Sequence, residues 1–186
     1  MNSISKTAQP HPSEDLYGFL NDAYDFFNRR LFDGRLPKCM LTLQRQPKMM
    51  GYASSKRWQN LRGDVADELA INPDYFKGHS TLEVFQTLVH EQCHIWQYHF
   101  GKPSRRGYHN REWADLMESI GLIPSSTGQP GGHKTGERMA DYVQKPGQFL
   151  QASIELIAKK NELPWYDCWK GGHQAHLSTI FSEDGK

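Results

Sequence analysis

The sequence has few cysteines and no long apolar run. Its three cysteines, Cys39, Cys93 and Cys168, are odd in number and far apart, so they predict neither a disulfide framework nor a Cys-x-x-Cys site. No run reaches the roughly 18 apolar residues of a membrane-spanning helix, and residues 1–15 lack the apolar segment of a signal peptide. We therefore expect an intracellular protein without membrane contact, either cytoplasmic or associated with the nucleoid.

The chain also lacks a large net charge, but its charges are unevenly distributed. The formal net charge is +1, yet residues 34–63 hold seven bases and no acid, and residues 101–111 hold four bases and no acid. The remainder of the chain is correspondingly acidic. If the two basic windows lie together in the fold, the protein has one basic face suited to phosphates.

The length of 186 residues predicts one domain with a sizeable core. Residues 1–12 contain two prolines and few apolar side chains, and we expect them to be a flexible tail. We expect the domain to occupy residues 13–186, with a core over about 16–124 and a C-terminal extension over 125–186. No internal repeat divides the chain.

Apolar spacing predicts a helix that Ser13 can cap and that Asp33-Gly34 ends. Three segments with alternating or β-prone residues then predict strands, at 39–46, 50–58 and 67–73. We expect the chain to form a monomer.

The middle of the chain contains the clearest helix of the sequence. Ser80 and Glu83 form an S-x-x-E capping box, and Gly101 follows the last apolar residue of the stripe. A second helix is predicted from Asn110 until Gly121 and Pro124, and an additional C-terminal helix over 149–157. The segment 124–137 is rich in Gly, Pro, Ser and Thr and long enough to suggest a functional lid.

The capped helix carries the motif His90-Glu91-Gln92-Cys93-His94, which is H-E-x-x-H. Positions i and i+4 share one face of a helix, so both imidazoles can reach one metal ion. Glu91 lies on the adjoining face, where its carboxylate can act as general base toward a metal-activated water. The motif predicts a metallopeptidase centre.

A catalytic zinc site usually has a third protein ligand, and four residues are candidates. His99 is five residues beyond His94, which rotates it off the ligand face, so we expect a surface histidine there. His109 follows a turn-forming stretch and is preferred, with Glu112 the main alternative and Glu118 a further one. Glu112 could instead orient a ligating histidine.

The order of motifs resembles the SprT-like (Spartan-type) zinc metalloprotease family over residues 16–124. The shared parts are H-E-x-C-H, a histidine after fourteen intervening residues in "GYHNREWADLM", and the upstream segments "AYDFFNRRLFDGRLP", "GYASSKRW" and "LAINPDYF". The resemblance implies an α+β fold, a zincin-like single domain with a small antiparallel sheet packed against the H-E-x-x-H helix. It also implies one Zn²⁺ per chain bound by His90, His94 and His109, with Glu91 as catalytic base.

The best-understood members of that family cleave proteins crosslinked to DNA, so the resemblance implies a role in DNA repair and a protein substrate associated with DNA. The basic windows offer candidate contacts to single-stranded or crosslinked DNA: Arg57, Trp58, Arg62, Arg105 and Arg106. A solvated basic surface with a structural tryptophan explains the same residues equally well.

Two other functions remain open from the sequence. A non-catalytic DNA-binding or regulatory protein would close its zinc site with a fourth ligand such as Glu112 or His133. A zinc peptidase of narrow specificity, unrelated to DNA, would have the same H-E-x-x-H motif. The Cys-rich zinc ribbon of many family members is missing, because only Cys168 follows the core.

Overall fold

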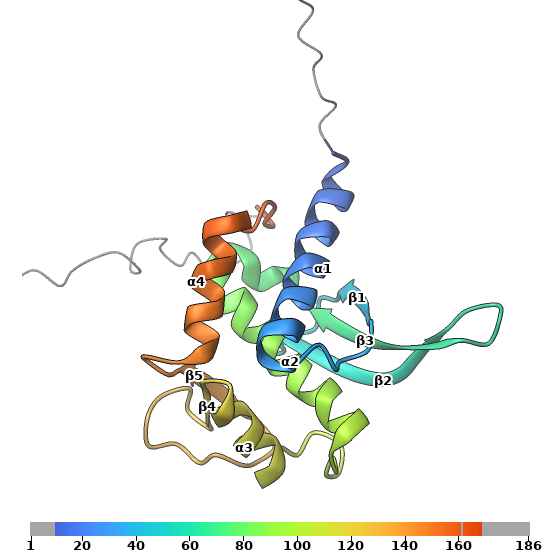
Figure 1. The fold of residues 1–186 in the computed structure, drawn as a ribbon. Helices are drawn as coiled ribbons and strands as arrows, with labels where there is room; N and C mark the ends of the chain where they lie inside the picture. The colour runs from blue at the N-terminus through green and yellow to red at the C-terminus, as the bar shows by residue number, and fades with distance from the viewer. Residues whose placement is uncertain (1–9, 161, 169–186) are drawn as a thin grey trace, which may run out of the picture.

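The computed structural model describes residues 10–160 and 162–168 and shows a mixed α/β fold with two small sheets (Figure 1). The predicted tail lies mostly outside this range. In chain order the elements are α1 (Pro12–Leu31), β1 (Met40–Leu43), β2 (Gly51–Gln59), β3 (Val65–Ile71), the 3-10 helix η1 (Pro73–Gly78), α2 (Thr81–Phe100), α3 (Arg111–Ser119), β4 (Leu122–Ser125), β5 (Ala140–Val143) and α4 (Gln148–Lys160).

Helix α1 begins slightly earlier than the sequence predicts. His11 occupies the N-cap position without a side-chain cap, and Pro12 is the first helical residue. The prediction that Ser13 caps this helix is therefore wrong. Proline is favourable at the first helical position because its fixed φ suits the helix and its missing N–H has no helical partner there.

The first sheet has the strand order β1-β3-β2. Strands β2 and β3 form an antiparallel hairpin that extends away from the helices (Figure 1), whereas β1 pairs with β3 in parallel. The expected antiparallel sheet is thus wrong for β1. Alternation of apolar residues identifies a strand and its buried face, but it carries no information on which neighbour the strand pairs with or in which direction.

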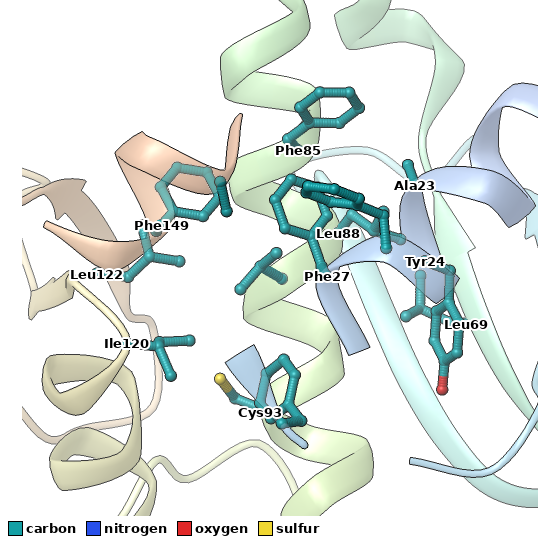
Figure 2. Close-up of a cluster of buried hydrophobic side chains, with 14 of the residues drawn as sticks. Ala23, Tyr24, Phe27, Leu69, Phe85, Leu88, Cys93, Ile120, Leu122 and Phe149 are labelled. Carbon is teal, nitrogen blue, oxygen red and sulfur yellow. The ribbon is translucent and has the colours of Figure 1, made fainter. Parts of the chain in front are cut away.

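Helix α2 is the centre of the fold. It contacts β2 and β3 on the sheet side and α1, α3 and α4 elsewhere. Phe27 of α1 packs between Phe85 of α2 and Phe149 of α4, with ring centroids 5.2 and 5.8 Å away (Figure 2). Cys93 belongs to the H-E-x-x-H motif, but its side chain is fully buried in this cluster. It therefore fills space in the core, as expected of a small apolar residue.

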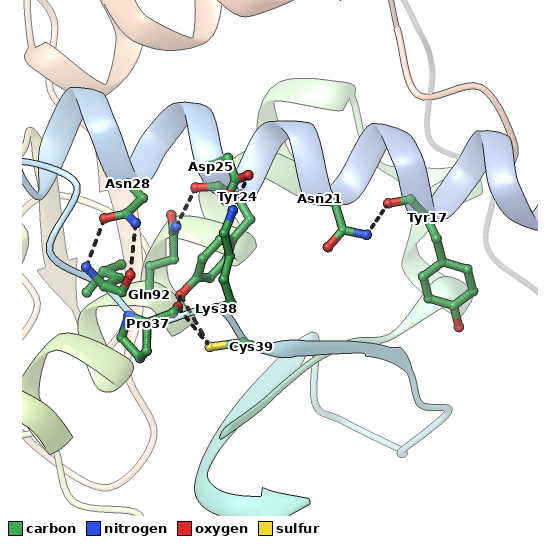
Figure 3. A network of polar contacts seen from close by, with 10 residues as sticks. Tyr17, Asn21, Tyr24, Asp25, Asn28, Pro37, Lys38, Cys39 and Gln92 are labelled. Carbon is green, nitrogen blue, oxygen red and sulfur yellow. Dashed lines mark hydrogen bonds and ion pairs between the residues drawn. The ribbon is translucent and has the colours of Figure 1, made fainter. Parts of the chain in front are cut away.

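The connection from α1 to β1 is fixed by buried polar groups in addition to the apolar packing of Phe32 and Leu36 (Figure 3). The Asn28 side chain donates to the carbonyl of Leu36 and accepts from its N–H. Gln92 of α2 donates to the backbone carbonyl of Tyr24, 2.9 Å away. These bonds hold α1 against the helix that carries the H-E-x-x-H motif.

A second sheet of β4 and β5 follows α3, where the sequence predicts a loop. The two strands are antiparallel, and Pro124, expected only to end the preceding helix, lies within β4 opposite Asp141. Strands of four residues are too short to show alternation, and proline is tolerated because β4 is an edge strand. None of the described helices is long and apolar enough to cross a membrane.

Candidate metal centre

The capped helix α2 presents its two motif histidines side by side. The capping box of Ser80 and Glu83 is present as predicted, and the His90 and His94 ring centroids lie 5.3 Å apart. Glu91 is buried, with 6% of its surface exposed, between α2 and β2. Because the helix is closed by its cap and packed on both sides, the histidines have a rigid support.

His109 joins the pair from the segment immediately before α3. Its ring centroid lies 4.8 Å from that of His94 and 5.6 Å from that of His90. A ligand atom of each of the three histidines lies within 4.8 Å of the others. The turn before Asn110, whose side chain caps α3, directs His109 back toward α2 as the sequence suggests.

Trp113 of α3 forms the back of the histidine cluster. The tryptophan is fully buried and its ring centroid lies 4.4 Å from His109, 4.9 Å from His90 and 5.4 Å from His94. It is nearly parallel to the His94 ring, at 16°. The indole therefore limits the rotation of all three imidazoles.

Two of the imidazoles have a partner on the nitrogen that points away from the cluster. Nδ1 of His90 lies 2.9 Å from a carboxylate oxygen of Asp141, and Nδ1 of His109 lies 3.1 Å from the carbonyl oxygen of Gly136. Sequence reasoning missed both partners. No local signal marks Asp141, which is 51 residues from His90 and sits in the unpredicted strand β5.

Burial and neighbouring charged groups together set the pKa values of the three imidazoles. Burial, together with the neighbouring His90 and His109, holds the pKa of His94 well below its usual range, and burial lowers the pKa of His109 to about 4. Burial also acts to lower the pKa of His90, but the hydrogen bond to Asp141 and the Glu91 carboxylate outweigh it and raise that pKa. His94 and His109 are thus neutral near pH 7, with lone pairs available.

The donor set fits a divalent metal ion. Nε2 of His94 and Nε2 of His109 lie 3.1 Å apart, close to the roughly 3.3 Å expected of two nitrogens bound to one tetrahedral ion at about 2.0–2.1 Å. Neutral imidazole is the form that ligates metal. The cluster of His90, His94 and His109 could therefore hold a metal ion.

The other candidate ligands lie elsewhere. Glu112 accepts from the Gln97 side chain and the Lys102 N–H, and Glu118 pairs with Lys134. His133, in contrast, is exposed. Within the described residues, the group suited to a metal ion at this place consists of the three histidines alone.

His99 points away from the cluster, as its helical position predicts. It is not a free surface side chain, however. Its Nε2 lies 2.5 Å from a carboxylate oxygen of Asp67, whose side chain is only 4% exposed. His99 therefore serves to pair a buried acid of β3.

The residues predicted to contact nucleic acid fall into two groups. Arg57 and Trp58 lie on β2 and Arg62 in the turn after it, whereas Arg105 and Arg106 lie in the loop after α2. Trp58 is 42% exposed. The two basic windows approach each other at the end of α2, where the Arg35 guanidinium lies 4.3 Å from the Phe100 ring.

Acidic partners reduce the basic character of these windows. Arg105 forms an ion pair with Glu137 at 2.6 Å, and Arg57 lies 3.8 Å from the buried carboxylate of Glu68. Within the described residues, five of the eleven bases have an acidic partner: Lys38, Arg45, Arg57, Arg105 and Arg111. The basic face is therefore weaker than the sequence count suggests.

Comparison with known proteins assigns the chain to a family. The model of the SprT-like family matches residues 20–130. A Salmonella typhimurium protein described as an uncharacterized protein in the mucB 3' region is 49% identical over 59 residues, which cover 31% of this chain and 80% of that protein. No solved structure matches significantly. Because the family match spans more than half of the sequence and includes all three histidines, the chain belongs to the SprT-like family.

Proposed function

We propose that the protein is a zinc-dependent metallopeptidase that hydrolyses peptide bonds of protein substrates. The observation that supports this function best is the convergence of His90, His94 and His109 beside Glu91. Three neutral-nitrogen ligands are typical of catalytic zinc sites, which keep a further position open. A purely structural site has no use for a buried carboxylate at position 91.

Each residue of the site has a distinct part in the reaction. His90, His94 and His109 hold the metal, which when bound supplies a Lewis acid that activates water and polarises the scissile carbonyl. Glu91 accepts the proton of the attacking water and delivers it to the leaving amine. In the metal-free protein, burial raises the pKa of Glu91 to about 7. The packing of α2 against β2 supports the zincin-like arrangement that this chemistry requires.

The decisive experiment compares the wild type with Glu91→Gln. Glutamine keeps the size of the side chain but cannot take a proton, so we expect about one bound zinc per chain and a loss of peptide cleavage. His99→Ala is the matched control, because His99 lies on the same helix outside the cluster, and it should retain zinc and cleavage. A Glu91→Gln variant that cleaves as fast as the wild type would show that the role given to Glu91 is wrong.

We further propose that the substrates are proteins bound or crosslinked to DNA inside the cell. Trp58 and Arg62 support this proposal, since an exposed tryptophan beside basic side chains can stack on an unpaired base while the bases contact phosphates. Cleavage of a DNA-bound protein should rise with single-stranded DNA and fall with salt. Trp58→Ala and Arg62→Ala should weaken this stimulation, whereas Trp165→Ala and Arg29→Ala, which alter exposed residues outside the windows, should not. Salt-insensitive cleavage without DNA binding would favour a narrow-specificity peptidase instead.

A further inference from the structure

One short segment contacts two of the three histidines at Nδ1, the nitrogen that points away from the cluster. Residues 136–141 lie beyond the part of the chain that matches the family model, which ends at residue 130. From this segment the Gly136 carbonyl contacts Nδ1 of His109, and the Asp141 carboxylate contacts Nδ1 of His90. The segment begins at the end of the stretch 124–137, for which the sequence suggests a lid, and its contacts are with candidate metal-binding side chains.

The Gly136 contact determines which nitrogen of His109 carries the proton. A carbonyl oxygen can only accept, so Nδ1 of His109 must donate and, in the neutral ring, Nε2 keeps its lone pair. The backbones of the two residues are paired as well, with N–H to carbonyl distances of 2.8 Å and 3.1 Å in the two directions. The position of Gly136 is therefore fixed relative to the ring that it orients.

The Asp141 contact acts in the same way on His90. A carboxylate accepts, so the 2.9 Å contact places the proton of His90 on Nδ1 and turns Nε2 toward the other two histidines. Asp141 is itself held, because the Gln86 side chain donates to its second carboxylate oxygen at 2.7 Å and to its backbone carbonyl at 2.9 Å. Its side chain is 5% exposed, so water competes little for the contact.

We propose that Asp141 is a positioning residue of the metal centre, and that residues 136–141 fix the tautomers and orientations of His90 and His109. This inference rests on the metal site of the proposed function. Partners of this kind strengthen metal binding because they orient the ligand and increase the basicity of its free nitrogen. The C-terminal extension thus takes part in the site by holding its ligands.

The first test measures zinc affinity by competition with a chromogenic chelator. We expect Asp141→Ala to weaken zinc binding by about tenfold to a hundredfold. Asp141→Asn keeps an acceptor oxygen without its charge, so its zinc affinity should fall less than that of Asp141→Ala. Gln86→Ala removes only the support of Asp141 and should show the smallest loss of zinc affinity. Asp115→Asn is the matched control, since Asp115 pairs with Arg111 on the exposed side of α3 and should bind zinc like the wild type.

The second test needs neither zinc nor activity. Proton–nitrogen correlation spectra of the metal-free protein at mildly alkaline pH report which nitrogen of each imidazole is protonated. We expect the proton on Nδ1 of both His90 and His109 in the wild type. Asp141→Ala should remove this preference from His90 only, because Gly136 still orients His109, which makes His109 the internal control.

The two tests separate the possible outcomes. Near-wild-type zinc affinity in both Asp141 variants, with an unchanged His90 tautomer, would overturn the inference. A lower melting temperature of the metal-free variants with an unchanged tautomer would reduce Asp141 to a structural role and would also overturn it. If the wild type binds no zinc, the proposed function fails. The spectra of the metal-free protein still decide whether Asp141 determines the tautomer of His90.

Discussion

Nε2 of His94, in the middle of α2, lies 3.1 Å from Nε2 of His109, which precedes α3. At this distance the nitrogens must share a proton or a cation, because two lone pairs facing each other repel. Since the pKa values of both rings are lowered, both imidazoles are neutral near neutral pH, which is the form that ligates a metal ion. This contact joins α2 to the segment before α3, where the Gln97 side chain also donates to Asn110 and Glu112.

We therefore predict that His109→Ala removes tight zinc binding, whereas His99→Ala does not. The first variant deletes one of three ligands, and the second deletes a histidine of the neighbouring turn whose partner is Asp67. Metal analysis after dialysis measures both. His99→Ala should instead lower the melting temperature, because it leaves the buried Asp67 carboxylate without its imidazole partner. Equal zinc content in both variants would contradict the assignment of His109.

Trp113 should report metal binding through its fluorescence. Its ring lies against all three imidazoles, so Co²⁺, which quenches nearby indoles, should reduce the emission when it occupies the site. Trp113→Phe should abolish this change. Trp96→Phe is the control, because Trp96 contacts Phe100 rather than the histidines. Titration with Co²⁺ followed by fluorescence provides the measurement, and a change that survives in Trp113→Phe would place the ion elsewhere.

Burial of Glu91 should make the stability of the metal-free protein depend on pH. The pKa rises from its ordinary 4.5 to about 7, so the folded state holds a proton that the unfolded state releases between these values. The contribution of Glu91 to the free energy of unfolding is therefore greatest at low pH, and it is lost as pH rises toward 7. Glu91→Gln lacks the effect, so its advantage over the wild type should grow across this range to at most about 3 kcal/mol. Urea unfolding of both proteins at several pH values tests this, and a constant difference would contradict it.

Gly51 allows β2 to approach α2 closely beside Glu91. A Cβ at this position would lie 2.8 Å from the carbonyl oxygen of Ala70, 3.0 Å from a Thr87 methyl carbon and 3.2 Å from Cγ of Glu91. We expect Gly51→Ala to lower the free energy of unfolding by about 1–3 kcal/mol through overpacking.

The matched control for this substitution is Gly18→Ala. Gly18 is an exposed residue of α1 with open space around its Cα, so alanine should raise the free energy of unfolding by about 0.5–1 kcal/mol. Urea unfolding measures both changes. We expect the two substitutions to change the free energy of unfolding in opposite directions. A Gly51→Ala protein as stable as the wild type would mean that β2 can move away from α2 without loss of stability.

Local patterns account for the elements that the sequence predicts well. The capping box, the apolar stripe and Gly101 define α2 almost to the residue, because each acts within a few positions of the chain. The spacing of His90 and His94 determines that they share a face, and the turn-forming residues before Asn110 allow His109 to return to it. Each of these inferences requires only helix geometry and turn chemistry.

The sequence predicts the strands β1, β2 and β3, but it fails on the pairing direction of β1 and on the second sheet. The segment that became β1 is recognisable as a strand, but its parallel pairing with β3 depends on which edge of the hairpin it reaches after α1. Strands β4 and β5 are held by each other and by α3 rather than by strand propensity. Their four residues each carry too little pattern to distinguish them from a loop.

The sequence by itself determined the groups of the candidate metal site: two histidines and a glutamate on one helical turn, and a third histidine within reach. Only the tertiary structure decided what surrounds those groups, namely Trp113 behind the rings, Asp141 and Gly136 on their outer nitrogens, and the burial that raises the pKa of Glu91. The physical reason is the distance along the chain over which each interaction acts. Helical spacing is set by neighbouring residues, whereas burial and hydrogen-bond partners depend on segments distant in the chain that meet only when the core forms.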